Sequence, residues 1–380
     1  TAVSSMAQGA RVSHWLNDYM QFGLTGYHQG EKGASSQTLR GIDATLRYRP
    51  GTFVKLERAE SVGGGSGTLA SQDGGFGFNG LSTMSTGTAV AQRIEASVDL
   101  AEVSEGGRGR LGGYAQTRDR GFSAPGQIVM NGEAARQAGV KGSLEVVPGT
   151  VLEAKADVRN TDTMDTNNTE VGIRQKVGDE WHLGVGGRHD RRETSLPNAS
   201  TILSQNGTRT DAVVRAEYRP LKSGDKPGLR EDWELYGFGQ GTLQRSGNRD
   251  ANNRLGVGGG YQVNERLKLL AEVSDGNLGV GGRVGGDYRI SDRSNVYLSY
   301  GMETENPNVA WRGRQGTWIS GASSRLSDEV RIFGENRAVH GAGPQSLINA
   351  FGLDLSPNDR WTFGVKGEVG TVSDPLAGDL

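Results

Sequence analysis

Histidine, cysteine and serine most often carry hydrolytic or metal chemistry in proteins, and in this chain none of them has the spacing that such chemistry needs. The 380 residues include five histidines and no cysteine, so thiolate metal sites, disulfides and cysteine nucleophiles are excluded. The histidines are His14, His28, His182, His189 and His340. No two of them are four residues apart, as zinc-binding histidines on a helix would be, and no G-x-S-x-G sequence marks a nucleophilic serine. We therefore expect no enzymatic activity, no catalytic or metal-ligating residue and no cofactor.

Three segments resemble ligand-binding loops without meeting the requirements of one. Asn160–Asn168 gathers side-chain oxygens that could hold calcium, but it lacks the glycine and the final glutamate of a known calcium loop, so we expect a solvated turn. Leu255–Tyr261 and Gly279–Gly286 contain fragments of the dinucleotide-binding GxGxxG pattern, which must be followed by a helix. No helical pattern follows either segment, so these glycines are expected inside strands.

The charged residues do have a regular arrangement, because they alternate with apolar residues. In residues 93–100, Arg93 and Glu95 fall on one face of an extended chain, and Ile94 and Val98 fall on the other. The same alternation recurs along the sequence in segments of about nine to thirteen residues, which is typical of strands and not of helices. We count about nineteen such strands.

Short turns and longer connections alternate between these strands. The short turns include Arg49–Thr52, Asn264–Arg266 and Ser291–Arg293, whereas longer connections such as 61–88 are rich in glycine, serine and asparagine. Strands this long exceed the ~5–6 residues usual in soluble sheets and match the ~9–11 residues that cross the hydrocarbon core of a bilayer. The sequence therefore predicts an all-β protein, a large antiparallel transmembrane β-barrel of about 19–20 or more strands. Its short turns are predicted to be periplasmic and its longer loops extracellular.

Composition is even along the chain, so residues 17–380 are expected to form a single barrel domain, with 1–16 as an N-terminal lead-in segment. The last residues, 373–380, resemble a loop, and an odd number of strands cannot close. We therefore expect the barrel to lack a C-terminal part. No run of 18 apolar residues predicts a transmembrane helix. The 42 basic residues nearly balance the 44 acidic ones, which argues against a nucleic-acid partner.

Two sets of residues are assigned by their position in the predicted strands. Charged residues on the polar faces are expected to line a lumen, where their mixed signs predict weak ion selectivity at most. These lumen candidates are Lys55, Glu57, Arg93, Glu95, Asp99, Lys155, Asp157, Arg188, Arg215, Glu217, Arg283, Asp287, Arg331 and Glu335, and Lys141 lies on the same kind of face. Aromatic residues close to the short turns are expected to form a girdle at the membrane boundary. These are Tyr48, Trp181, Tyr218, Trp233, Tyr261, Tyr288, Tyr297 and Trp361.

The run Gly51–Phe76 and the turn at Tyr288–Tyr297 resemble the barrel region of very large Gram-negative surface proteins, in which repeated domains are joined to a bacterial outer-membrane barrel. The resemblance brings no catalytic residues. It implies contact with outer-membrane lipid and lipopolysaccharide, with the barrel-insertion machinery, and with a passenger or surface domain of the same or another chain. Such barrels usually end on an aromatic residue, and this sequence ends on Leu380.

The function predicted from these patterns is a pore, or a translocation or anchoring channel, in the bacterial outer membrane, with no chemistry of its own. The connection 61–88 is expected either to narrow the lumen or to lie over its mouth. Two alternatives stay open. One is a soluble or surface-exposed β-rich adhesin or structural protein, and the other is an outer-membrane hydrolase built on the barrel.

Overall fold

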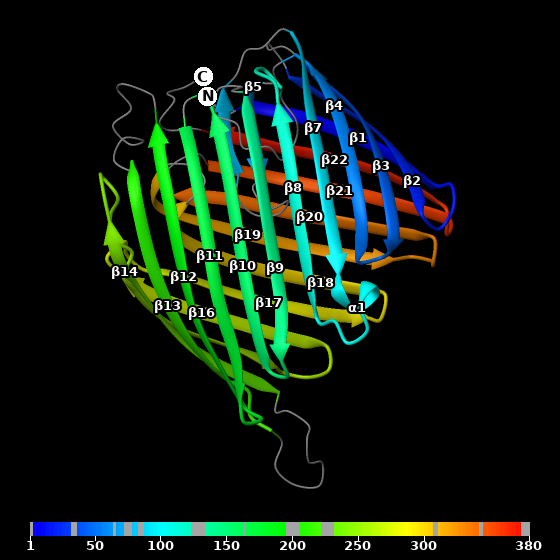
Figure 1. The fold of residues 1–380 in the computed structure, drawn as a ribbon. Coiled ribbons are helices and arrows are strands. Elements are labelled where there is room, and N and C mark those ends of the chain that lie inside the picture. The colour runs from blue at the N-terminus through cyan, green and yellow to red at the C-terminus, as the bar shows by residue number, and fades with distance from the viewer. Residues whose placement is uncertain are drawn as a thin grey trace.

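A computed structural model describes residues 3–31, 36–63, 66–71, 78–82, 87–122, 134–162, 164–194, 206–221, 232–306, 311–341 and 345–373. Within these ranges, 20 strands form one closed antiparallel sheet, in which neighbours along the chain are also neighbours in the barrel. Figure 1 shows the colour running once around the barrel wall from blue to red. The all-β class and the large antiparallel barrel predicted from the sequence are confirmed.

The barrel strands have between 9 and 15 residues. In chain order they are β1 (Val3–Trp15), β2 (Met20–Glu31), β3 (Gln37–Arg49), β4 (Thr52–Val62), β7 (Thr88–Asp99), β8 (Gly109–Arg118), β9 (Ala135–Val147), β10 (Thr150–Thr161), β11 (Met164–Val177), β12 (Trp181–Thr194), β13 (Gly207–Tyr218), β14 (Trp233–Arg245), β15 (Arg254–Gln262), β16 (Leu267–Gly276), β17 (Gly281–Ser291), β18 (Ser294–Asn306), β19 (Trp311–Arg325), β20 (Val330–Gly341), β21 (Gln345–Asn358) and β22 (Trp361–Ser373). A separate hairpin of β5 (Ser66–Ser71) and β6 (Phe78–Ser82) lies in the connection between β4 and β7. That this connection narrows the lumen stays a prediction.

The barrel closes where β1 pairs with β22, in a register that runs from Val3 opposite Val372 to His14 opposite Trp361. The predicted lead-in segment 1–16 is therefore wrong, because most of it is a barrel strand. With β1 included, the described sheet has 20 strands, an even number within the predicted range of about 19–20 or more. Small residues such as Ala7 and Gly9 weaken the alternation of apolar and polar residues in β1. This strand is instead stabilised by its pairing with β2 and β22.

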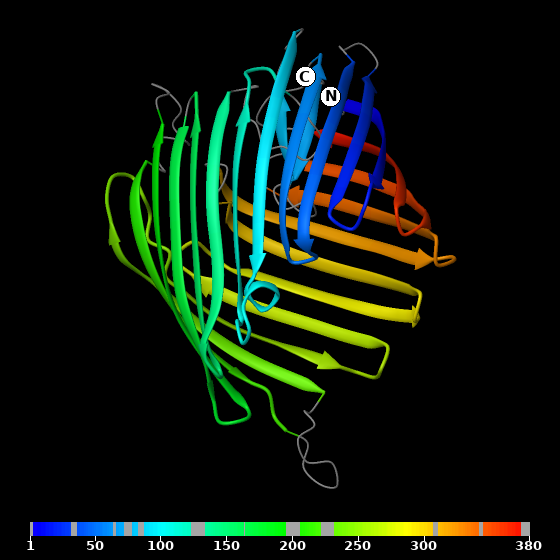
Figure 2. The ribbon, with the colours of Figure 1, turned by 45° about the vertical axis from the view of Figure 1, so that its right-hand side comes forward.

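Short turns at one end of the barrel use asparagine side chains to fix the chain reversal. The Oδ1 atoms of Asn17, Asn264 and Asn358 each accept hydrogen bonds from the backbone N–H groups two and three residues further on, at 2.8 to 3.1 Å. Between β9 and β10, Gly149 adopts a φ of 85°, which a residue without Cβ adopts at little cost. Most of the longer connections join strand ends at the opposite rim, which is at the top in Figure 2. The start of β1 and the end of β22 lie at that rim too, since Val3 pairs with Val372. The connection between β13 and β14 is an exception among the longer connections, because it joins strand ends at the rim of the short turns.

The distribution of side chains is inverted relative to a soluble domain. Large apolar side chains on one face of the strands are exposed on the outer wall, for example Val140 at 63% and Leu255 at 74%. Among the described residues, more polar and charged side chains are buried than hydrophobic ones. A small apolar cluster of Leu39, Ala89 and Phe122 lies near the loop rim.

The described part of the chain has one helix, α1 (Leu100–Val103), in the connection between β7 and β8. It has four residues, and no helix in the described ranges is long and apolar enough to cross a membrane.

Candidate functional site

The interior of the barrel contains a cavity of about 1870 Å³, lined mainly by β1 to β4, β7 to β13 and β22. Its walls carry charged residues of both signs. Six of the fourteen predicted lumen candidates line it, and these are Glu57, Arg93, Glu95, Lys155, Asp157 and Arg188. Lys141 lines it as well. The alternating charges of the sequence are thus brought together around one water-accessible space.

Arg93 on β7 joins charges from two neighbouring strands into a ladder. Its guanidinium lies 3.1 Å from the Glu95 carboxylate on the same strand and 3.9 Å from Glu57 on β4. Lys55 pairs with Glu57 two residues further along β4. These contacts show that opposite charges neutralise each other both between neighbouring strands and two residues apart on one strand. The same spacing pairs Arg215 with Glu217 at 3.5 Å.

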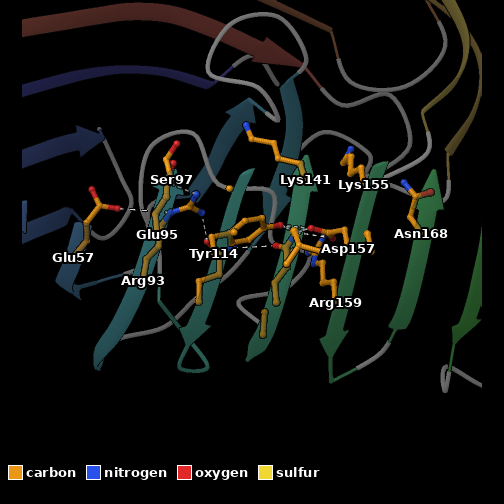
Figure 3. Close-up of a pocket in the computed structure, with 18 of the residues that line it drawn as sticks. Glu57, Arg93, Glu95, Ser97, Tyr114, Lys141, Lys155, Asp157, Arg159 and Asn168 are labelled. Atoms are coloured by element: carbon orange, nitrogen blue, oxygen red, sulfur yellow. Dashed lines mark hydrogen bonds and ion pairs between the residues drawn. The ribbon is translucent and has the colours of Figure 1, made fainter. Parts of the chain in front are cut away.

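Tyr114, Gln137 and Asp157 form a polar network across three strands, which we call the Tyr114 network. The Tyr114 hydroxyl on β8 donates to the Asp157 carboxylate on β10, and Gln137 Nε2 on β9 donates to the same hydroxyl at 2.7 Å and to Asp157 Oδ1 at 2.9 Å. Gln116 on β8 donates to Gln137 at 2.9 Å. Figure 3 shows Tyr114 reaching over the middle strand toward Asp157. Each of these polar groups therefore has a partner within the wall, which favours a fixed arrangement.

Arg11 on β1 and Asp43 on β3 form a second link that passes over an intervening strand. The two guanidinium nitrogens lie 2.5 and 2.8 Å from the two carboxylate oxygens, a bidentate geometry that gives charge-assisted hydrogen bonds. Gly23 on β2 lies beneath the pair, and a Cβ added there would be 2.3 Å from Asp43 Oδ2. The glycine is therefore required by the close approach.

A buried charge cluster lies at the loop rim, the end of the barrel that carries most of the longer connections. The sequence analysis did not predict this cluster. Its five side chains are each at most 5% exposed: Asp190 and Arg192 on β12, Arg209 and Asp211 on β13, and Arg249 in the connection between β14 and β15. Arg249 pairs with Asp190, Arg209 Nε lies 2.8 Å from Asp211 Oδ2, and Asp211 also accepts from a Thr242 hydroxyl at 2.6 Å. The opposite charges two residues apart on β12 and β13 were a usable signal. Arg249 lies in a connection without periodicity and gave none.

Eight lumen candidates do not line the cavity. Three form ion pairs or hydrogen bonds elsewhere on the wall: Arg283 lies 3.2 Å from Glu272, Asp287 accepts from Asn295 at 3.4 Å, and Glu335 accepts from Arg337. Asp99 caps α1 by accepting the Ala101 N–H at 3.1 Å, and it pairs with Arg110 at 3.1 Å. The remaining four are Lys55, Arg215, Glu217 and Arg331, of which Arg331 stands opposite Asp354 in register.

Seven of the eight predicted girdle aromatics lie at the rim of the short turns, on the apolar faces of their strands. Tyr48, Trp181, Trp233, Tyr261, Tyr288 and Trp361 are exposed, and Tyr218 packs between Trp181 and Trp233 with ring centroids 4.8 and 5.9 Å away. Tyr297 is a correction, since its hydroxyl donates to Glu335 inside the barrel. The register explains this, because Tyr288 stands opposite Val296 and so Tyr297 faces the other way.

The described histidines and the described part of Asn160–Asn168, where a solvated turn is expected, form no ligand set. The described residues contain no group of three or more histidine or acidic side chains placed to hold a metal ion. His189 and His340 contact the hydroxyl groups of Thr210 and Tyr300 at 2.8 and 3.3 Å. The expected solvated turn at Asn160–Asn168 is mostly strand, because β10 extends to Thr161 and β11 begins at Met164.

Comparison with known proteins gives the fold. No protein-family model matches the sequence, and no curated protein matches it either. Solved structures do match, among them the FrpB iron transporter from Neisseria meningitidis, with a TM-score of 0.50 and 8% identity over 98% of this chain and 81% of that one. The ferric-catecholate import receptor Fiu from E. coli K12 has a TM-score of 0.47 and 9% identity over 97% and 81% of the two chains. A porin from Rh. blastica covers 98% and 99% of the chains at 11% identity and a TM-score of 0.32.

At such low identities the match to the FrpB structure supports the barrel architecture alone. The matches are transporters and porins by name, and none of them supports the narrower resemblance to large repeat-bearing surface proteins, which stays a prediction.

Proposed function

We propose that this chain spans the bacterial outer membrane as a water-filled pore with weak preference for the sign of an ion. The observation that carries the proposal is the inverted distribution of side chains, with apolar residues on the outer wall and charges around the cavity. A soluble protein rarely exposes a contiguous apolar surface of more than a few hundred Å². A closed sheet also satisfies its backbone hydrogen bonds without water, which lipid requires.

The aromatic side chains near the short turns support the same orientation to a bilayer. Trp181, Tyr218 and Trp233 pack side by side where three strands meet the turns, and amphipathic rings favour the boundary between hydrocarbon and headgroups. On this basis the short turns face the periplasm and the longer connections face outward. The outer wall argues against the soluble adhesin.

A pore is favoured over a sealed anchor because of the cavity. About 1870 Å³ of space lies among described side chains whose charges have both signs, and ion pairs such as Arg93 with Glu95 neutralise part of them. Rings of charged side chains of one sign are a common source of charge selectivity in channels, and mixed signs weaken it. Partition of the protein into detergent, together with ion conductance in a planar bilayer, tests the proposal. Extraction as a soluble protein without detergent would overturn it.

A further inference from the structure

The wall between β8 and β11 carries two neighbouring cations. Lys141 on β9 and Lys155 on β10 are partners in the strand register, and both line the cavity. Like charges directly opposite each other in a sheet destabilise it, so such a pair is usually neutralised by a neighbouring carboxylate. In the part of the chain that the structure describes, neither lysine has an ion pair.

The carboxylates close to Lys155 are already engaged by other partners. Asp157, two residues along β10, accepts from Tyr114 and Gln137. Glu170, opposite Lys155 on β11, lies 3.7 Å from Arg188 and accepts from Asn168 at 3.2 Å. Glu153 lies 3.9 Å from Arg174. The acidic side chains around Lys155 are thus turned to other groups and leave its ammonium to the lumen.

The neighbours of Lys141 are small and uncharged. Gly112 on β8 stands opposite it, and Gly139 and Ser143 flank it on β9. Beyond Gly112, Ser97 on β7 is next in the register. All four residues line the cavity and none of them is charged, so the side of Lys141 that faces β8 is open to the lumen. Figure 3 shows both lysine side chains above the Tyr114 network, with the Lys141 side chain extending away from Lys155. A Cβ added at Gly112 would lie 3.7 Å from Lys141 Cε, so the Lys141 side chain leans over β8.

We propose that Lys141 and Lys155 form a binding subsite for the phosphate group of a solute that passes through the lumen, an inference that rests on the proposed pore. A phosphate monoester carries about −1.5 to −2 charges at neutral pH, so one group can neutralise both ammonium ions. Lysine binds phosphate as a point charge with three rotatable donors on a flexible stem, so both side chains can turn toward a phosphate group placed between their strands. The hydroxyl groups of Ser97 and Ser143 supply further donors on the open side.

Inorganic phosphate is the probe, and binding is measured by calorimetry on the full chain in detergent, so that the result does not depend on conduction. We expect saturable binding to the unmodified protein. Lys141→Gln and Lys155→Gln are each expected to weaken it at least tenfold. The matched control is Lys366→Gln, because Lys366 lines the same cavity but is already paired with Glu368 at 2.6 Å, and its loss should change phosphate affinity less than twofold.

A second measurement separates this inference from the proposed function. In a planar bilayer, phosphate should reduce the chloride current of the unmodified protein and leave that of the two lysine variants unchanged. Conductance without phosphate binding in the calorimeter would overturn the subsite and leave the pore intact. Absence of conductance would overturn the pore, and the calorimetry would still decide whether the two lysines bind phosphate. Equal loss of phosphate affinity in Lys366→Gln would overturn the subsite, since any cation in the lumen would then contribute as much to phosphate binding as the two lysines.

If a glutamine variant does not fold, the arginine variants Lys141→Arg and Lys155→Arg are measured in its place. Both are expected to retain saturable phosphate binding. Loss of binding in both arginine variants would contradict the subsite.

Discussion

Tyr114 on β8 and Asp157 on β10 are joined by a hydrogen bond that passes over the strand between them, at Gly139. A Cβ at Gly139 would lie 2.7 Å from Asp157 Oδ2 and 2.7 Å from Tyr114 Cε1, so only glycine leaves room for the contact. The same triplet of tyrosine, glycine and carboxylate occurs twice more. Its other members are Tyr236, Gly258 and Glu272, and Tyr297, Gly321 and Glu335. These contacts connect strands that do not share backbone hydrogen bonds.

Replacement of this glycine should therefore weaken the barrel. Gly139→Ala forces Tyr114 and Asp157 apart and leaves polar groups without their partners, which we expect to lower the free energy of unfolding by about 1–3 kcal/mol. Gly26→Ala is the matched control, because no atom lies within 4 Å of a Cβ placed at Gly26 on β2. Urea unfolding in detergent, followed by tryptophan fluorescence, measures both. Equal loss in the two variants would show that the contact over Gly139 contributes nothing.

The two faces of a strand should tolerate a charge very differently. Ile94 on β7 is 45% exposed on the outer wall, whereas Ser97 lines the cavity. Ile94→Arg should cost about 2–4 kcal/mol if this part of β7 lies near the bilayer midplane, and Ser97→Arg should cost much less because water reaches it. Unfolding in lipid vesicles gives both values. A similar cost on both faces would contradict the membrane assignment.

The buried charge cluster should depend strongly on Arg249. Arg249→Ala removes the guanidinium that pairs with the carboxylate of Asp190, a side chain only 4% exposed, and breaking a buried ion pair typically costs about 3–5 kcal/mol. Arg191→Ala is the control, since Arg191 pairs with Glu193 while 57% exposed and should change stability by under about 1 kcal/mol. Denaturant midpoints compare the two. An Arg249→Ala variant as stable as the control would show that the ion pair of Arg249 with Asp190 does not anchor the connection between β14 and β15.

The orientation in the membrane can be tested with single cysteines, since the native chain has none. Asn277 lies at the loop rim between β16 and β17, and Asp292 lies in the short turn between β17 and β18. On intact cells, an impermeant thiol reagent should label Asn277→Cys and spare Asp292→Cys. Labelling of the short turn alone would reverse the proposed orientation.

Features that depend on alternation along one strand could be predicted from the sequence, whereas features that depend on the register between strands could not. Period two alone places Arg93 and Glu95 on the polar face, and the structure finds both on the cavity wall. The distance of Tyr297 from a turn predicts its height along the barrel, but its direction depends on the register, which shifts between Arg289 and Ser291.

Other features depend on contacts between distant parts of the chain. β1 has weak alternation and becomes recognisable only through its pairing with β22, more than three hundred residues later. Arg249 lies in a connection, where no periodicity indicates burial. The link between Tyr114 and Asp157 needs three strands in register, and a single sequence does not reveal that register.

We expect the lumen to conduct ions, and the current through the purified full chain in a planar bilayer measures this directly. With potassium chloride at unequal concentrations on the two sides, the account predicts stable unitary conductance and a reversal potential close to zero, because cations and anions pass nearly equally. An inserted, folded barrel that carries no current would contradict the account and indicate an anchor with a sealed lumen.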